Sequence, residues 1–297
     1  MNEELLRDCP EEKNRIEPGT LYLVATPIGN LADLSERAIK TLCGVDFIAA
    51  EDTRVTAKLL AHIGVSKPMI PYHAHNQRSC GETIVARLRE GEACALVTDA
   101  GSPVISDPGE DIARLCEEQG VAVTVIPGPC AAICALMLSG LNARRFSFEG
   151  FLEGTPAAQR ERLTLLRSDD RTLIFYASPH DLTDTLSLLR EVLGNRRIAL
   201  CREMTKRNEE IQRTDLDGAL REYASRPPRG EYVLVVEGGH AESEFWAEMS
   251  IEEHVAFYEG NGMRRMDAIK AAARDRGVAK NVIYRQLLPE EPDAKHQ

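Results

Sequence analysis

The sequence contains no long hydrophobic run, and this absence excludes a membrane-spanning helix. No apolar stretch in the 297 residues approaches the roughly 18–20 residues that a span requires. No signal peptide, with its basic start and apolar centre, precedes the first expected strand at Leu21. The sequence therefore predicts a cytoplasmic protein without a membrane partner.

Positive charge is also scarce. The chain carries 36 Lys and Arg residues against 47 Asp and Glu residues, which gives a formal net charge of −11. On average this balance argues against RNA as a partner. However, contact with nucleic acid depends on where the positive charge lies rather than on its total.

Paired cysteines are lacking as well. None of the eight cysteines belongs to a Cys-x-x-Cys pair, and most lie in expected strands or helices, as reduced core residues do. Cys130 and Cys134 could share one face of a helix, but neither a histidine nor a second cysteine pair supports a metal there. We therefore expect no metal site.

The common phosphate-binding loops are missing too. The chain has no glycine-rich loop followed by Lys and Ser or Thr, and no Gly-x-Gly-x-x-Gly motif that opens a helix. Instead, loops rich in proline and glycine follow expected strands within residues 25–30, 96–109 and 126–131. The loops hold no Lys or Arg, and acidic residues lie in or near them: Asp33, Glu51, Asp52, Asp99 and Asp107. We expect one pocket for a neutral or cationic ligand, although such loops can also simply end strands.

Strands and helices alternate along the first half of the chain. Apolar runs predict strands at residues 21–25, 45–50, 93–98 and 121–126, with helices between them and an Asp33 cap on the first helix. This alternation is typical of a doubly wound α/β domain. Strands predicted at 172–176, 197–201 and 231–237 indicate a second α/β unit. We expect a flexible tail at 1–18, α/β domains at 19–140 and 141–239, and a linker with a helical segment at 240–297.

Several longer motifs occur in a fixed order. They are TPIGNLADLSERA (26–38), AAEDTR (49–54), TDAGSPVISDPG (98–109), IPGPCAA (126–132), EGF (149–151), LIFYASPH (173–180) and GEYVLVVEG (230–238). The chain thereby resembles the tetrapyrrole-methylase-like, S-adenosylmethionine-dependent methyltransferases, and most closely their branch that acts on small-subunit ribosomal RNA. The resemblance covers roughly residues 19–238.

The resemblance implies an α/β fold of two domains with an S-adenosylmethionine-binding cleft between them, and a small helical appendage at the C-terminus. It implies transfer of a methyl group to the ribose 2′-hydroxyl of a cytidine in the decoding region of 16S rRNA. The implied partner is therefore the small ribosomal subunit, and the implied assembly is a homodimer. The family's cofactor-binding positions correspond here to Pro27, Ile28, Gly29, Asp99, Gly101, Ser102, Pro103, Val104, Ser106, Pro127, Gly128, Ala131, Tyr176, Glu203 and Met204.

Catalytic candidates lie at the end of the second strand and shortly after it. A ribose hydroxyl is a poor nucleophile near neutral pH, so a base is expected to help. Our candidates are Glu51 and Asp52, followed by His73 and His75. Asp52 could instead cap a helix and pair with Arg54, and the two histidines could contact RNA, because no carboxylate or thiol partner for a metal is placed beside them.

The basic residues gather near the C-terminus. Residues 263–286 contain seven Lys and Arg against two Asp, a local charge of +5 that reverses the overall sign. Helical spacing on both sides of Gly277 predicts two short helices with a basic face, which favours an RNA-binding appendage over an ordinary solvated surface. The candidate RNA contacts are Arg54, Lys206, Arg264, Arg265, Lys270 and Lys280.

Two positions depart from the family pattern. Ala177 stands where the family usually has Glu, and Asn208 replaces a position that is commonly aromatic. Two alternatives therefore remain: a methyltransferase for tetrapyrroles, which shares fold and cofactor, and a non-catalytic RNA-binding assembly factor with a relic pocket. The basic C-terminal segment argues against the first alternative.

Overall fold

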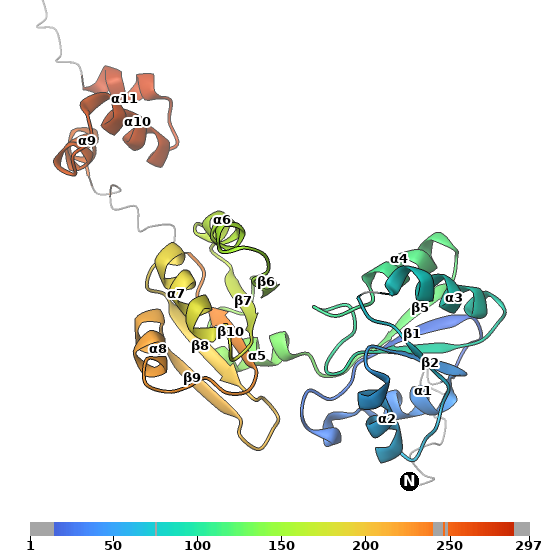
Figure 1. The fold of residues 1–297 in the computed structure, drawn as a ribbon. Helices are drawn as coiled ribbons and strands as arrows, with labels where there is room; N and C mark the ends of the chain where they lie inside the picture. Colours follow the sequence, from blue (N-terminus) through green and yellow to red (C-terminus); the bar gives the residue numbers. More distant parts are fainter. Residues whose placement is uncertain (1–14, 75, 240–245, 247–248, 288–297) are drawn as a thin grey trace, which may run out of the picture. The chain divides into compact units, whose positions relative to one another are not determined.

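The computed structural model describes residues 15–74, 76–239, 246 and 249–287. The chain divides into two compact units (Figure 1). The first comprises residues up to 167 together with 171–238, and the second comprises 168–170 together with the residues from 239 onward. Most of the tail predicted at residues 1–18 lies outside the described residues, as does most of the linker that follows residue 239. The two units are described separately.

The first unit begins with a parallel five-stranded sheet. Its strands are β1 (Thr20–Val24), β2 (Phe47–Ala50), β3 (Met69–Pro71), β4 (Cys94–Val97) and β5 (Ala122–Ile126), in the order β3-β2-β4-β1-β5. Four of these strands confirm the predicted ones to within a few residues, whereas β3 has only three residues and was not predicted. Because all strands run parallel, the loops after β1, β4 and β5 emerge at the same edge of the sheet.

Helices cover both faces of this sheet, as the doubly wound prediction requires. Helices α1 (Glu36–Gly44) and α2 (Thr53–His62) pack on the face that carries Val24, Ile48 and Val97. Helices α3 (Gln77–Arg89) and α4 (Glu110–Glu118) pack on the other face, against the neighbouring strand residues. Alternate residues of one strand thus belong to different cores, which explains why these strands are apolar throughout.

The cap predicted for the first helix was wrong. Asp33 ends a short 3₁₀ helix (η2, Leu31–Asp33), and the Asn30 side chain caps that helix instead. Helix α1 is capped by the Ser35 hydroxyl, which accepts a hydrogen bond from the backbone N–H of Ala38. Both Asp33 and Ser35 suit an N-cap, so residue type alone did not separate them.

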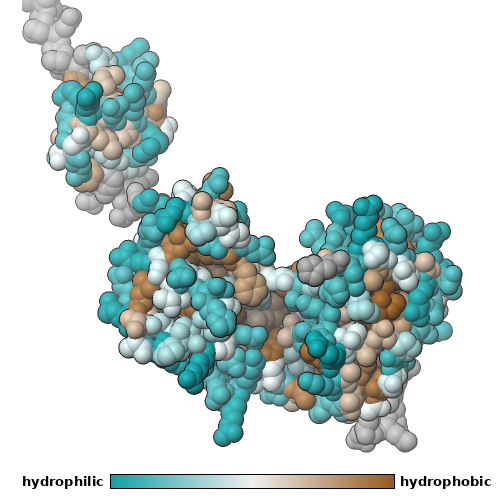
Figure 2. All heavy atoms as spheres, viewed as in Figure 1, coloured by the Kyte–Doolittle hydropathy of each residue, from teal (hydrophilic) through white to brown (hydrophobic). Residues whose placement is uncertain are grey.

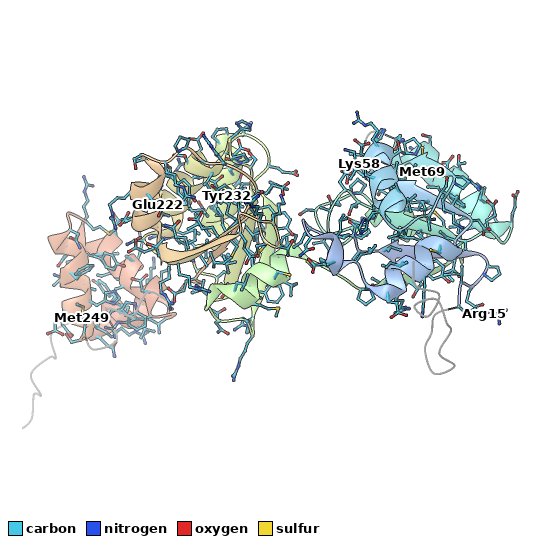
Figure 3. The ribbon with its side chains drawn as sticks, turned by 90° about the horizontal axis from the view of Figure 1, so that it is seen from below. Arg15, Lys58, Met69, Glu222, Tyr232 and Met249 are labelled. Atoms are coloured by element: carbon cyan, nitrogen blue, oxygen red, sulfur yellow. The ribbon has the colours of Figure 1, made fainter. Side chains whose placement is uncertain are left out.

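The second sheet of the first unit is mixed. Strands β6 (Phe146–Phe151), β7 (Thr172–Ala177), β8 (Arg197–Arg202), β9 (Glu210–Asp215) and β10 (Tyr232–Val236) lie in the order β6-β7-β10-β8-β9. Only β6 and β7 pair in parallel, and the other three pairs are antiparallel. The central strand β10 is buried along its whole length. In Figure 3, Tyr232 and Glu222 mark this part of the unit, and Lys58 and Met69 mark the first.

Four helices cover the second sheet. Helices α6 (Pro156–Leu166), α7 (Leu182–Leu193) and α8 (Leu216–Tyr223) contribute to the core on one face. Helix α5 (Ala131–Ser139) packs on the other face through Ala132, Ala135 and Leu136. The predicted boundary at residue 140 assigns α5 to the first domain, whereas its core contacts are with the second sheet. We call the first sheet with α1–α4 the first lobe, and the second sheet with α5–α8 the second lobe.

The second unit is a small helical cluster. Helices α9 (Ile251–Gly260), α10 (Arg265–Asp275) and α11 (Lys280–Gln286) share a core of Val255, Ala268, Ile269, Ala272, Ala273 and Ile283. Helices α10 and α11 confirm the two predicted helices, with Gly277 between them at φ +64°. Hydrophilic side chains cover much of its visible face (Figure 2). In the part of the chain that the structure describes, no helix of either unit is long and apolar enough to cross a membrane.

Candidate active site

A cavity of about 440 Å³ lies at the carboxyl edge of the first sheet, and the second lobe forms part of its wall. Loops after β1, β4 and β5 line it through Ile28, through the 99–107 loop and through Cys130 and Ala131. The second lobe contributes residues from β6, β7, β8 and β10. The prediction that three proline- and glycine-rich loops share one pocket is confirmed.

Hydrogen bonds hold the three loops together. The backbone N–H of Thr26 donates to the Gly101 carbonyl over 2.8 Å, and the N–H of Gly101 donates back to Thr26 over 3.1 Å. The Ser102 hydroxyl donates to the Pro129 carbonyl over 3.0 Å and so joins the second loop to the third. The wall of the cavity is therefore a connected backbone framework, as a site that reads its ligand through main-chain groups requires.

Backbone strain gathers beside this cavity. Among the described residues, the four non-glycine residues with positive φ are Val104 (79°), Ser106 (63°), Glu203 (51°) and Thr205 (64°). Ser106 and Glu203 line the cavity, and Val104 and Thr205 lie within two residues of them. Such conformations cost of order 1–3 kcal/mol each and concentrate at functional sites. The 103–106 and 203–206 loops, one from each lobe, are thus the strained parts of the site.

Most of the predicted cofactor-binding residues line the cavity. Those that do are Ile28, Asp99, Gly101, Ser102, Ser106, Ala131, Tyr176, Glu203 and Met204. The remaining six belong to the same loops without lining the cavity: Pro27, Gly29, Pro103, Val104, Pro127 and Gly128. Gly128 packs so closely on the first loop that an added Cβ would lie 2.9 Å from the Cβ of Ala25. These six therefore belong to the loop framework around the cavity.

Three carboxylates of the first lobe line the cavity: Glu51, Asp99 and Asp107. Burial raises the pKa of Glu51 and that of Asp99, although backbone N–H groups partly oppose the effect. Burial, reinforced by the charges of Glu51 and Asp99, raises the pKa of Asp107 to about 7. The first lobe thus presents a concentration of negative charge, and it contributes no Lys or Arg to the lining.

Asp52 has a different environment from its neighbour Glu51. Its carboxylate caps helix α2 by accepting from the backbone N–H of Arg54 over 2.8 Å, and it also forms an ion pair with the Arg54 guanidinium at 2.6 Å. These hydrogen bonds lower the pKa of Asp52 to about 2. Asp52 is not among the cavity-lining residues, so the structure favours the cap and ion pair over a role as a base.

The two histidine candidates are not placed at the cavity. His73 does not belong to the lining residues, and its backbone N–H donates to the Asn76 side chain over 2.9 Å. Its proximity to Glu51 opposes the rise in the pKa of that carboxyl, which burial dominates. His75 lies outside the described residues. Among the described residues, no group of three His, Cys, Asp or Glu side chains is arranged to hold a metal.

Tyr176 connects β7 with the start of α5 at the cavity, within the second lobe. Its hydroxyl accepts a hydrogen bond from the backbone N–H of Ala132, at the start of α5, over 3.2 Å. Its ring makes edge contacts with Phe148 and Phe151, at 5.1 and 5.4 Å between centroids. Burial raises the pKa of the Tyr176 phenol to about 12, so this group stays protonated near neutral pH.

Lys206 lies in the cavity wall rather than on an open RNA-binding surface. Its ammonium donates to Glu203 and to Glu231, each over 2.8 Å. Its side chain also covers Gly29 of the first lobe, where an added Cβ would lie 2.4 Å from the Lys206 Cγ. Through Lys206, the 203–206 loop therefore contacts Gly29 of the first lobe.

The remaining RNA candidates are exposed. The Arg54 side chain is 86% exposed in its ion pair with Asp52. In the second unit, Arg264 precedes α10, Arg265 and Lys270 lie 3.8 and 3.0 Å from the carboxylates of Glu259 and Asp267, and Lys280 opens α11. Arg276 of the same basic segment is instead structural, because its guanidinium donates to His254 and to three backbone carbonyls.

Sequence reasoning did not select several residues of the lining. They are Asp107, Phe151, Ala177, Ser178, Pro179, Cys201, Glu231, Tyr232 and Val233. Among these residues, Asp107 could have been selected from the sequence, because its carboxylate lies in the motif TDAGSPVISDPG, which forms one of the predicted pocket loops. Ala177, which departs from the family pattern, is buried at the end of β7 and borders the cavity.

Two α/β lobes around an acidic cavity, with a wall built from main-chain loops, form the architecture of one class of methyltransferase. Residues 20–220 match the family of tetrapyrrole (corrin/porphyrin) methylases, and the chain belongs to this family. The fold agrees: the methyltransferase CobJ aligns with a TM-score of 0.58 at 19% identity, over 74% of this chain and 94% of that one. Uroporphyrin-III-C-methyltransferase from Thermus thermophilus aligns with a TM-score of 0.52 at 21% identity, over 73% and 94%.

Curated relatives are more similar in sequence. Ribosomal RNA small subunit methyltransferase I from Halalkalibacterium halodurans is 45% identical over 92% of this chain and 96% of its own length. The proteins of that name from Bacillus subtilis and Escherichia coli O157:H7 are each 42% identical, over 94% and 92% of this chain and 98% and 96% of theirs. These similarities confirm the resemblance inferred from the motifs.

The cavity suits the cofactor of this family, S-adenosylmethionine. Its volume of about 440 Å³ lies within the roughly 300–1,000 Å³ of small-molecule sites. Apolar side chains such as Ile28, Ile105 and Met204 offer a surface for a flat ring, and the first-lobe carboxylates offer negative charge for a sulfonium and an ammonium group. When bound, this cofactor supplies an activated methyl group.

Proposed function

We propose that the chain transfers a methyl group from S-adenosylmethionine to the ribose 2′-hydroxyl of a cytidine in the decoding region of 16S rRNA. The observation that carries the proposal is the acidic, loop-built cavity in a chain that aligns with ribosomal RNA small subunit methyltransferases over nearly their whole length. The cytoplasm, which holds the ribosomal subunits, is the corresponding location.

Positioning accounts for much of the catalysis in this proposal. Holding the acceptor oxygen about 3–3.5 Å from the methyl carbon supplies a large part of the rate without covalent chemistry by the protein. The strained 103–106 and 203–206 loops and the hydrogen-bonded loop framework provide a rigid wall for this purpose. The close approach of Lys206 to Gly29 ties the second lobe to the first, and the hydrogen bond from Ala132 to Tyr176 fixes the start of α5 at the cavity.

Asp107 is our candidate for the proton acceptor. A base works best when its pKa lies near the working pH, and the pKa of Asp107 is raised to about 7. Glu51 is the second candidate, because it lines the same cavity and its pKa is also raised. In the transfer, the hydroxyl proton passes to one of these carboxylates. The two carboxylates interact electrostatically, so they titrate as a pair.

The second unit supplies the RNA-binding part of the proposal. Arg265, Lys270 and Arg274 expose 64%, 59% and 79% of their side chains. Such cations neutralise phosphates and give a sequence-independent, salt-sensitive affinity. The small helical cluster is therefore proposed to hold the ribosomal substrate while the first unit carries out the methyl transfer.

A homodimer is part of the same proposal. In the first unit, Val123 and Val125 on the edge strand β5 are 38% and 59% exposed, and Ile133 and Met137 on α5 are 41% and 78% exposed. Where exposed apolar side chains form one patch, they mark a protein–protein interface. Light scattering coupled to gel filtration is expected to give twice the chain mass of 32.9 kDa, and a single chain mass would contradict this part of the proposal.

A transfer assay with three acceptors tests the function. Labelled S-adenosylmethionine is incubated with the protein and with 30S subunits, naked 16S rRNA or uroporphyrinogen. We expect label in ribosomal RNA and none in the tetrapyrrole. Label only in the tetrapyrrole would support the alternative methyltransferase. RNA binding without transfer to any acceptor would support the assembly factor with a relic pocket.

A further inference from the structure

A second cavity, of about 490 Å³, adjoins the candidate active site in the second lobe. We call it the arginine cavity, because Arg202, Arg226 and Arg229 line it. It shares the lining residues Glu203 and Tyr232 with the candidate active site. A group bound in the arginine cavity would therefore lie next to the ligand of the active site.

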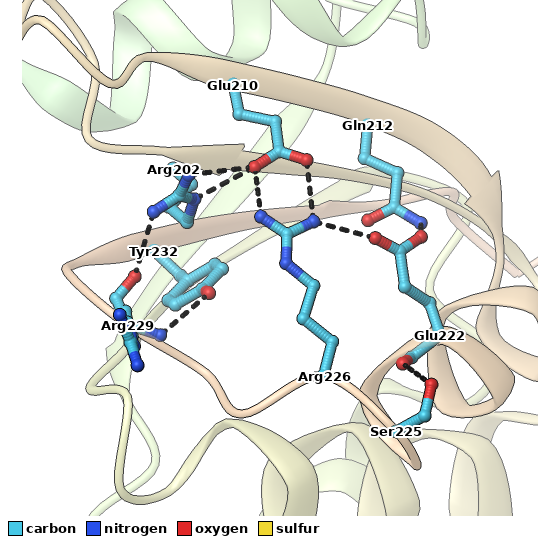
Figure 4. A network of polar contacts seen from close by, with 8 residues as sticks. All are labelled: Arg202, Glu210, Gln212, Glu222, Ser225, Arg226, Arg229 and Tyr232. Carbon is cyan, nitrogen blue, oxygen red and sulfur yellow. Dashed lines mark hydrogen bonds and ion pairs between the residues drawn. The ribbon is translucent and has the colours of Figure 1, made fainter.

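A single carboxylate orients two of the three arginines (Figure 4). Arg202 and Glu210 are cross-strand partners of β8 and β9, and the Arg202 Nη2 lies 2.9 Å from the Glu210 Oε2. The same oxygen lies 2.5 Å from the Arg226 Nη2, and Arg226 also reaches Glu222 over 2.8 Å. Hydrogen bonds from Arg226, joined by those from Arg202, lower the pKa of Glu210 to about 2. Both guanidinium groups are thus held in place before any ligand arrives.

The third arginine is held only through its backbone. The N–H of Arg229 donates to the Tyr232 hydroxyl over 3.2 Å, and its carbonyl accepts from Arg202 over 3.4 Å. Within the described part of the chain, its guanidinium has neither a hydrogen bond nor an ion pair. Arg229 thus brings an uncompensated charge to the lining.

Arg229 gives the lining a positive charge that no carboxylate offsets among the described residues, whereas Arg202 and Arg226 pair with Glu210 and Glu222. The charged side chains of the lining are the three arginines and Glu203, and the Glu203 carboxylate already accepts from Lys206 over 2.8 Å. A guanidinium presents its donors in a planar fork that matches phosphate oxygens. On a chain of net charge −11, three arginines around one cavity indicate an anionic ligand.

We propose that the arginine cavity binds a backbone phosphate of the substrate RNA, close to the nucleotide whose ribose enters the active site. This inference rests on the proposed function, because only an RNA acceptor brings a phosphate next to the reacting sugar. Contacts to phosphate fix the register of a nucleic acid on a protein. Asn208 also lines this cavity, at a position where the family commonly has an aromatic residue.

The test compares two arginine variants of the full chain in binding to 30S subunits at several salt concentrations. Arg229→Ala removes the uncompensated guanidinium and keeps the backbone contacts. Arg221→Ala removes an exposed arginine of α8 that does not line the cavity. For Arg229→Ala, we expect 30S affinity to fall about tenfold and the slope of log affinity against log salt to fall by about 1. Arg221→Ala is expected to change neither quantity.

The outcomes separate this inference from the proposed function. Unchanged affinity and salt slope in Arg229→Ala, with normal methylation by the wild type, would overturn the phosphate site alone. Absence of methylation by the wild type would count against the function, whatever the variants do. Binding of inorganic phosphate that Arg229→Ala abolishes, with an unchanged salt slope for 30S subunits, would assign the cavity to a free anion and also overturn the proposal.

Discussion

The two lobes that line the candidate active site differ in where they place charged side chains. The first lobe contributes Glu51, Asp99 and Asp107 to the cavity and no basic residue. The second lobe contributes Lys206 together with Glu203 and Glu231 to that cavity, and it contributes three arginines to the adjoining one. The difference matches the two ligands of the proposed reaction, a cofactor that carries positive charge and an RNA that carries negative charge. It also shows why a net charge of −11 did not exclude RNA.

Replacing one acidic residue of the first lobe, Asp107, is expected to have the largest effect on turnover. Asp107→Asn keeps the size of the side chain but cannot accept the ribose proton. We expect kcat to fall about 10²–10⁴-fold, the usual contribution of a general base. The affinity for 30S subunits should stay within about twofold, since no phosphate contact is lost. Single-turnover methyl transfer at saturating RNA measures the change.

Glu51→Gln is the matched comparison for that experiment. A large loss in Glu51→Gln with near-normal turnover in Asp107→Asn would transfer the role of base to Glu51. Near-normal turnover in both variants would contradict the assignment of a base to the first lobe.

The RNA-binding role proposed for the second unit can be separated from that of the second lobe. Combined replacement of Arg265, Lys270 and Arg274 by Ala removes three exposed charges. We expect 30S affinity to fall roughly 10–100-fold and the salt slope to fall by about 2–3. S-adenosylmethionine binding, measured by calorimetry, is expected to be unchanged. An unchanged salt slope would confine RNA recognition to the first unit.

The acidic lobe also predicts a dependence of stability on pH. The pKa of Asp107 is raised from 3.8 to about 7 in the folded chain. Between these values the folded state binds the proton more tightly than the unfolded state, so this residue makes the free energy of unfolding fall as the pH rises. In Asp107→Asn, the gain in Tm over the wild type should therefore be near zero at pH about 4, grow up to pH about 7 and then level off.

The size of that gain is modest because Asp107 is partly exposed to solvent. We expect about 1 kcal/mol, or roughly 2–4 °C in Tm. Thermal unfolding of both proteins between pH 4 and 8 measures it. A gain that is largest at pH 4 would contradict the raised pKa.

The contact between the lobes can be weakened at Gly29. This residue has φ +153°, and an added Cβ would lie 2.4 Å from the Lys206 side chain. Gly29→Ala is expected to cost about 1–3 kcal/mol of stability and to weaken cofactor binding, because Lys206 and the 203–206 loop must shift. Gly120→Ala is the control, since Gly120 has φ +66° but no atom within 4 Å of an added Cβ. Equal effects on cofactor affinity in the two variants would contradict a role of the contact between Lys206 and Gly29 in cofactor binding.

The smallest effect is expected at Asp52. Asp52→Asn keeps a side-chain oxygen for the N-cap of α2 and loses only the exposed ion pair with Arg54. Exposed ion pairs contribute about 0–1 kcal/mol, and Asp52 does not line the cavity. Turnover is therefore expected to stay within about twofold. A loss of turnover as large as that expected for Asp107→Asn would instead indicate that Asp52 is a catalytic residue.

Much of the fold could be predicted from the sequence. Strands β1, β2, β4 and β5 are apolar throughout because both of their faces are covered, and such runs are recognisable without a structure. The pocket loops were recognisable for a related reason, since their prolines and glycines follow these strands directly. The motifs then identified the family.

Other features depend on contacts between distant residues. Strand β9 is only partly buried and carries polar residues that pair across to β8, so it has no apolar pattern. The positive φ of Val104 and Glu203 is imposed by the surrounding loops, since neither residue type favours it. Asp52 and Asp107 look equivalent in the sequence, and only the position of Arg54 and the burial of Asp107 separate them.

The position of the transferred methyl group tests the central claim most directly. 30S subunits lacking the modification are incubated with the protein and S-adenosylmethionine, and the nucleosides of their digested 16S rRNA are analysed by mass spectrometry. The account predicts one 2′-O-methylcytidine in the decoding region, formed by the wild type and strongly reduced with Asp107→Asn. A methyl group on a base, or no methylated nucleoside at all, would contradict it.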